Sequence, residues 1–76
     1  MSGLKLPVLV ARVIIQKLGR AGFRFIYAKG SHYFMQHPIT KKITSIPMHG
    51  SKNIGKGLLN KILKQAGISL KQFLDL

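Results

Sequence analysis

The sequence predicts an α+β fold with the order helix, three antiparallel strands, helix and short C-terminal helix, in one domain over residues 1–76. The first observation behind this prediction is that apolar residues recur at helical spacing near both ends of the chain and alternate in the middle. The second is that turn residues divide the alternating region into three short runs, as in an antiparallel meander. No cysteine is present, so the core must stabilise the domain without disulfides, and a reducing cytoplasm fits.

The first helix is expected to begin near Pro7, which suits a first helical position. Apolar residues then recur at helical spacing until Gly19 and Gly22 end the pattern. These apolar residues are Val10, Val13, Ile14, Leu18 and Ala21. Because Val8–Ile15 is rich in β-branched residues, a buried strand is an alternative there, although the length of the periodic region favours a helix.

Three strands of a meander are expected next. Alternation predicts that Phe23, Phe25 and Tyr27 lie on one side of the first strand. Turn residues then separate the strands from one another. The predicted segments are a strand over Phe23–Ala28, a turn at Lys29–Ser31, a strand over His32–His37, a turn at Pro38–Lys41 and a strand over Lys42–Pro47.

A second amphipathic helix is expected after the Gly- and Lys-rich segment Met48–Lys56, and it should end at Gly67. Its apolar residues are Leu59, Ile62, Leu63 and Ala66. Ser69 can cap a last short helix that carries Phe73. Strands this short need helices packed on one face of their sheet. The predicted arrangement is therefore that of a double-stranded-RNA-binding domain, α-β-β-β-α, with a short C-terminal helix.

The charge balance predicts a polyanionic partner. Thirteen Lys and Arg residues accompany a single acid, Asp75, which gives a net charge of +12. Such a charge repels itself unless an anion compensates it. RNA is the expected partner because each Lys or Arg contact with a phosphate releases condensed counterions. An acidic protein that shields the same surface is a second, compatible partner, and a basic surface that is merely solvated is the alternative.

Membrane, metal and cofactor functions are not expected. No stretch approaches the ~20 apolar residues of a membrane span, and the apolar run Leu6–Ala11 is too short for a signal peptide. A single acid cannot supply a two-metal nuclease, a glycosidase pair or a Ser-His-Asp triad. The spacings of His32, His37 and His49 match no familiar zinc pattern. We therefore expect a cytoplasmic protein without a metal or another cofactor.

Four residues are candidates for contacts with RNA phosphates. Lys52 and Lys56 lie at or before the N-terminus of the second helix, where the helix dipole makes an added cation unfavourable and a bound anion favourable. Lys29 and Ser31 come from the turn before His32. The alternative is a solvated loop whose lysines serve only solubility.

His32 is the candidate catalytic residue, because histidine exchanges protons near neutral pH and the start of a strand fixes a side chain better than a loop tip. RNA supplies its own nucleophile, the 2′-OH, so a base and nearby cations can suffice for cleavage. His49 is the second candidate, either as a general acid or as a hydrogen-bonding residue of its loop. His37 is expected at the surface or in contact with RNA. The alternative for His32 is a structural histidine.

Three aromatic residues of the predicted sheet have two interpretations. Tyr27, Tyr33 and Phe34 could stack on RNA bases. In so small a sheet, however, aromatic side chains more often belong to the core.

Four pieces of the chain, taken in order, resemble one family. They are Ala21-Gly22-Phe23, Lys29-Gly30-Ser31-His32, Ile46-Pro47-Met48-His49-Gly50 and the segment Gly57–Gly67. Together they resemble the HicA toxins of bacterial and archaeal toxin–antitoxin pairs, over about Leu6 to Leu74. A departure is Leu58, where many family members carry Thr.

The resemblance implies a toxin that inhibits translation and growth as an mRNA interferase, with a fold like that of a double-stranded-RNA-binding domain. It implies that the histidine of the Gly-Ser-His motif, here His32, is catalytic, and that a HicB-type antitoxin protein covers the active site. His32 is then expected to take the proton from a ribose 2′-OH, leaving a 2′,3′-cyclic phosphate and a 5′-OH end. The alternative is a non-catalytic module that binds double-stranded RNA.

Overall fold

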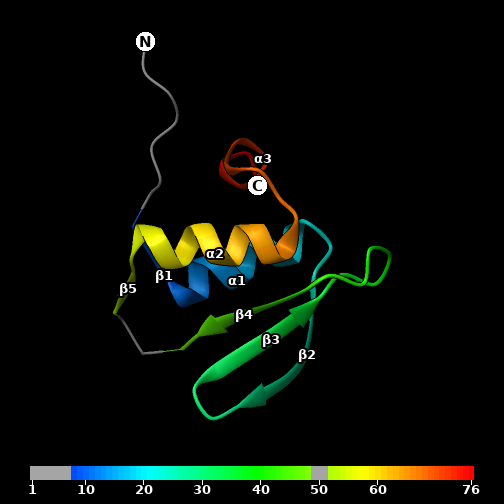
Figure 1. The fold of residues 1–76 in the computed structure, drawn as a ribbon, viewed down its shortest axis with the longest axis horizontal. Coiled ribbons are helices and arrows are strands. Elements are labelled where there is room, and N and C mark those ends of the chain that lie inside the picture. Colours follow the sequence, from blue (N-terminus) through cyan, green and yellow to red (C-terminus); the bar gives the residue numbers. More distant parts are fainter. Residues whose placement is uncertain (1–7, 49–51) are drawn as a thin grey trace.

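The computed structural model describes residues 8–48 and 52–76, and in them the chain is an α+β protein (Figure 1). Its helices are α1 (Ala11–Arg20), α2 (Lys56–Ala66) and α3 (Leu70–Leu74). Its strands are β1 (Leu9–Val10), β2 (Arg24–Lys29), β3 (His32–Gln36), β4 (Ile43–Pro47) and β5 (Asn53–Ile54). The predicted order of helix, three-stranded meander, helix and short C-terminal helix is confirmed. The sequence pattern does not predict β1 and β5, because a strand of two residues has no alternation to detect.

The first helix begins at Ala11, later than predicted. Leu9 and Val10 instead pair antiparallel with Ile54 and Asn53 of β5. The prediction that Val10 belongs to the helix is therefore wrong, and the strand alternative is correct for Leu9 and Val10 alone. Pro7 lies outside the described residues. Within α1 the core-facing residues are Ala11, Ile14 and Leu18.

The main sheet is antiparallel with the order β2-β3-β4, so β3 is its middle strand. Met35 of β3 is buried in the core, and Tyr33 packs against that core. Because successive side chains of a strand point to opposite faces, His32 and Phe34 lie on the other side of the sheet. We call the side that carries Met35 the inner face, and the side that carries His32 and Phe34 the outer face.

A β-bulge in β2 changes which residues share a face. Phe25 pairs with Met35, whereas Tyr27 pairs with Phe34, and the register shifts between them. Cross-strand partners lie on the same face, so Phe25 is on the inner face and Tyr27 on the outer face. The prediction that Phe25 and Tyr27 share a face is therefore wrong, because the extra residue of a bulge interrupts the alternation.

The helices pack against the inner face. Figure 1 shows α1 and α2 on one side of the sheet, with α3 beyond them, and both α1 and α2 contact β4. The buried residues of α2 are Leu59, Ile62, Leu63 and Ala66, as predicted. Gly67 ends α2 with φ +72°, and Ser69 begins α3 with the predicted cap, in which its side chain accepts from the Gln72 N–H. The predicted sheet with helices on one face is confirmed.

Candidate functional site

His32 is held at the start of the middle strand, between two neighbours. It pairs with Lys29 of β2 and with Pro47 of β4. A two-residue turn, Gly30–Ser31, joins β2 to β3. Gly30 has φ +58° and Ser31 does not have a positive φ, the pattern of a type II′ hairpin turn with glycine first. The turn and the two cross-strand partners together fix the backbone of His32, which carries the imidazole.

His32 lines a groove of about 280 Å³ between the outer face and α2. The strand residues of its lining are His32, Ser45 and Pro47. The helix residues are Leu58, Lys61, Ile62 and Gln65. These four follow the spacing i, i+3, i+4 and i+7, which places them on one side of a helix. The groove thus forms where this side of α2 reaches past the edge strand β4.

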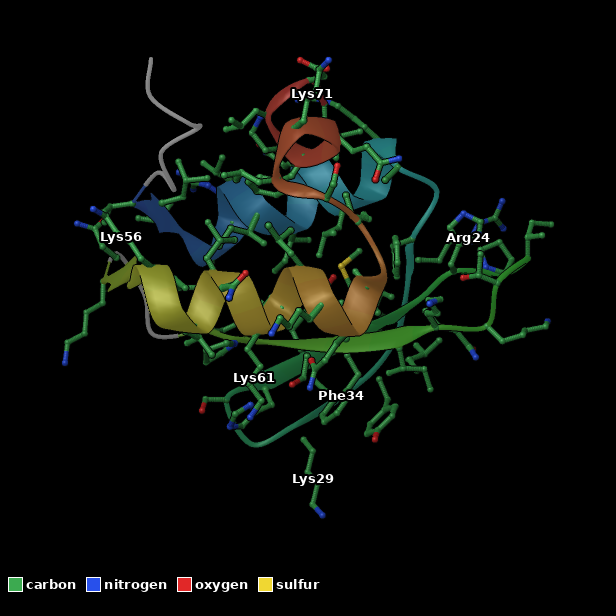
Figure 2. The ribbon with its side chains drawn as sticks, turned by 45° about the horizontal axis from the view of Figure 1, so that its top comes forward. Arg24, Lys29, Phe34, Lys56, Lys61 and Lys71 are labelled. Atoms are coloured by element: carbon green, nitrogen blue, oxygen red, sulfur yellow. The ribbon has the colours of Figure 1, made fainter. Side chains whose placement is uncertain are left out.

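Lys61 shares the groove with His32, and the sequence pattern alone does not single it out. The sequence does place Lys61 beside the buried residues of α2. The position of α2 on β4 must be known, however, before this indicates that Lys61 lies near His32. Figure 2 shows Lys61 extending from α2 toward the sheet, whereas Lys56 lies at the N-terminal end of the helix. An ammonium group beside an imidazole can stabilise negative charge that develops during a proton transfer.

Hydrogen bonds fix the contact between α2 and β4 at this groove. The side-chain oxygen of Gln65 accepts from the Ser45 N–H at 3.4 Å. The buried Thr44 hydroxyl lies 3.1 Å from both the Ile62 carbonyl and the Gln65 Oε1, and it can donate to one of them at a time. Because Gln65 uses its oxygen in these bonds, its two N–H hydrogens stay available to a ligand.

The other predicted phosphate-binding residues do not line this groove. Lys29 is directly across β2–β3 from His32. The carbonyl of Ser31 accepts from the Met48 N–H at 2.6 Å, which joins the chain after β4 to the turn before His32. Lys52 is exposed before β5. Lys56 is the first residue of α2, where no side chain caps the helix and no acid lies in the first turn.

The two other histidines have different outcomes. His49 lies outside the described residues. His37 is half-buried and organises the β3–β4 turn, because its Nδ1 accepts from the N–H groups of Ile39 and Thr40 at 3.1 and 3.3 Å. Its ring also packs edge-on against Phe23, with 5.3 Å between centroids. His37 therefore has a structural role that its place before Pro38 did not predict.

The described residues contain neither of two features that would suggest other functions. Among residues 8–48 and 52–76, no group of three or more His, Cys, Asp or Glu side chains is placed to hold a metal ion. No helix in that part of the chain is both long enough and apolar enough to cross a membrane. Asp75 lines a second cavity, of about 450 Å³, together with His37 and away from the His32 groove.

Comparisons with known proteins give a family and a relative. The family described as the HicA toxin of bacterial toxin–antitoxin matches residues 11–68. A protein of Pseudomonas fluorescens (strain Pf0-1) named probable mRNA interferase HicA is 40% identical over 47 residues, which cover 62% of this chain and 75% of that relative. The matched region of the family runs from α1 to just beyond α2, so it includes His32, the groove and Lys61.

Proposed function

This chain belongs to the HicA toxin family of bacterial toxin–antitoxin systems, and from that membership we propose that it is an mRNA interferase. In this proposal it is a metal-independent endoribonuclease that acts in the cytoplasm, inhibits translation and growth by cutting mRNA, and is neutralised by a HicB-type antitoxin. The observation that supports the proposal most is the groove lined by both His32 and Lys61. A base and a cation in one groove can suffice for cleavage through a ribose 2′-OH.

The proposed reaction begins with a ring nitrogen of His32, which takes the proton of a ribose 2′-OH. The 2′-oxygen attacks the adjacent phosphorus, and the bond from phosphorus to the 5′-oxygen breaks. The products are a 2′,3′-cyclic phosphate and a 5′-OH end, the latter formed when the leaving oxygen gains a proton from water or from a second acid. His49 is the candidate for that acid. DNA lacks the 2′-OH, so the same site would leave DNA intact.

Lysine side chains are proposed to hold the charge. The ammonium of Lys61 would face the non-bridging phosphate oxygens, whose negative charge grows as the pentavalent species forms. Lys29 and Ser31, beside His32, are proposed to contact the same phosphate or the next one. Lys52 and Lys56 would bind phosphates farther along the strand, at the uncapped N-terminus of α2.

The proposal is tested with single-stranded RNA incubated with the protein in EDTA, after removal of any bound antitoxin. We expect cleavage to persist in EDTA and to fall by about 10²- to 10⁴-fold in His32→Ala, the usual contribution of general acid–base help. Thermal unfolding must show that the variant still folds. Full activity in a folded His32→Ala protein would transfer the role to His49 or to another residue.

A second candidate function is a module that binds double-stranded RNA without cutting it. The α-β-β-β-α order favours it, because domains of that arrangement recognise RNA by its shape. Its signature would be tight binding of duplex RNA by antitoxin-free protein together with uncut single-stranded RNA after long incubation.

A further inference from the structure

Two aromatic side chains form a stacked pair on the outer face of the sheet. The rings of Tyr27 and Phe34 are 4.5 Å apart between centroids and nearly parallel, at 5°. The Tyr27 side chain is 49% exposed. Both helices that pack on the sheet lie against its inner face (Figure 1). The pair therefore is not part of the core, contrary to the expectation for aromatic residues in so small a sheet.

The bulge in β2 is what brings this pair together. With regular alternation Tyr27 would share the inner face with Phe25, but the register shift turns it to the outer face opposite Phe34. On that face Phe34 is two residues from His32, and Tyr27 is two residues from Lys29. Residues at that spacing along a strand are roughly 7 Å apart, a distance that one nucleotide of an extended RNA strand can span.

The stack is directed toward the strand that borders the groove. The centroid separation of the two rings is close to the spacing of neighbouring strands, so the stack runs across the sheet from β2 to β3. The next position in that direction is Ser45 of β4, which pairs with Phe34. Phe34 is half-buried, and serine is small, so a planar group placed over Ser45 would lie beside the Phe34 ring. Ser45 also lines the groove that contains His32.

We propose that the Tyr27–Phe34 pair is a stacking site for one base of single-stranded RNA, next to the phosphate held at His32. This inference rests on the proposed function, because it takes RNA as the substrate of the groove. Base–aromatic stacking is tolerant of sequence and is a common means of holding single strands. The site fixes the nucleotide adjacent to the cleaved bond and so orients its 2′-OH toward the imidazole.

The charges around the pair favour RNA over a protein as the occupant. Arg24 and Lys29 lie on the same face of β2 as Tyr27, and Lys61 lies in the adjoining groove. The one acidic side chain of the sequence, Asp75, lines the other cavity. A base on the aromatic pair would thus have its own phosphates beside cations.

The inner face supplies a matched control. Phe25 and Tyr33 form a second aromatic pair, also with 4.5 Å between centroids, and Phe25 is 50% exposed. This pair lies on the opposite side of the sheet from His32. Phe25→Leu therefore removes a ring about as exposed as that of Tyr27 without touching the proposed site.

The test measures binding of a fluorescein-labelled single-stranded RNA of roughly 12 nucleotides to proteins that carry His32→Ala, so that the RNA stays intact. We expect Tyr27→Leu or Phe34→Leu to weaken binding by about 5- to 150-fold, the range for loss of one stacked base. Phe25→Leu should change it by less than about twofold, within the usual scatter of surface substitutions. Equal losses in Phe25→Leu and Phe34→Leu would overturn the proposal, because the pairs would then matter only for sheet stability.

A second measurement separates stacking from folding. Each base of the RNA is removed in turn while its sugar and phosphate are kept. With Phe34 present, one abasic position should weaken binding, and with Phe34→Leu the same position should make no further difference, as expected for groups in contact. If no abasic position behaves in this way, the proposal is overturned. It is also overturned if Tyr27→Leu and Phe34→Leu leave RNA binding unchanged but weaken binding of the antitoxin, because the face would then be a protein-docking surface.

Failure of the stacking site is distinguishable from failure of the proposed function. Cleavage by the protein with His32 intact, measured separately, decides whether the groove is a nuclease. If RNA is cut but neither aromatic substitution alters binding, the nuclease stands and the stacking site is wrong.

Discussion

Lys61 and Lys64 lie three residues apart on α2, and of the two only Lys61 lines the groove with His32. Because the two side chains carry the same charge, comparing their alanine variants distinguishes a local effect on the reaction from a general attraction for RNA. In the proposed mechanism Lys61, but not Lys64, meets the phosphate that becomes more negative.

We predict that Lys61→Ala lowers the rate constant for RNA cleavage at saturating protein by about tenfold or more, less than the ~10²- to 10³-fold cost of a buried oxyanion donor because the groove is open. Lys64→Ala should stay within about twofold of the parent at constant ionic strength. Single-turnover kinetics on a labelled RNA measure both. Equal losses of cleavage rate in the two variants would mean that Lys61 contributes only to the overall positive electrostatic field that attracts RNA.

Glycine is favoured at position 30 by its backbone conformation, because its φ is +58°. Steric crowding is not the reason, since nothing lies within 4 Å of a Cβ built there. We predict that Gly30→Ala lowers the free energy of unfolding by about 1–2 kcal/mol, the cost of the left-handed region for an L-residue. Gly57→Ala, in helical backbone with equally open space, should instead be stabilising by up to about 1 kcal/mol. Urea denaturation of both variants measures the difference, and a neutral Gly30→Ala would contradict the turn assigned here.

The sequence singles out His32 as the candidate, because the Gly-Ser-His motif and the start of an alternating run both point to it, and the structure places it in the groove. The sequence does not single out Lys61, since its place in the groove depends on how α2 packs against β4, a contact that includes side-chain hydrogen bonds of Thr44 and Gln65. The outer-face position of Tyr27 was likewise hidden, because a bulge leaves no mark in a pattern of alternating residues.

The helices and the three long strands were predictable because each has a clear period and recognisable ends. Gly67 closes α2 in a left-handed conformation, and Ser69 caps α3, both as the residue types predict. The pairing of β1 with β5 was not predictable, because it depends on bringing Leu9 next to Ile54 across most of the chain. The late start of α1 follows from that same pairing.

The capping box of α3 makes a separate prediction. Ser69 accepts from the Gln72 N–H at 3.1 Å, Gln72 accepts from the Ser69 N–H at 2.8 Å, and the helix buries Phe73 completely. Ser69→Ala should cost about 1 kcal/mol of stability, and Ser69→Asn, which retains a capping oxygen, should cost less. Thermal unfolding ranks the two variants. If Ser69→Ala proved as stable as the parent, the cap would not be what holds α3 on the core.

The net charge of +12 acts on the entire protein in two opposite ways. Mutual repulsion opposes folding, and the same charges attract RNA. We therefore predict that raising the concentration of NaCl increases the unfolding temperature of the free protein while it weakens RNA binding, because salt screens both effects. Differential scanning fluorimetry and anisotropy titrations over one salt series measure them. An unfolding temperature that falls with salt would show that self-repulsion is not a significant cost.

The close approach of Gly22 and His37 matters for how loss-of-function variants should be interpreted. Gly22 has φ +103°, and a Cβ at that position would lie 2.8 Å from the His37 Nε2. Any side chain there must therefore displace a ring that supports a turn, far from the groove. A genetic selection for cells that survive expression of the protein would therefore recover replacements of Gly22 as well as replacements of His32. Quantifying the amount of intact polypeptide in each surviving clone would tell them apart, since His32 alleles should accumulate normally and Gly22 alleles should be depleted by proteolysis.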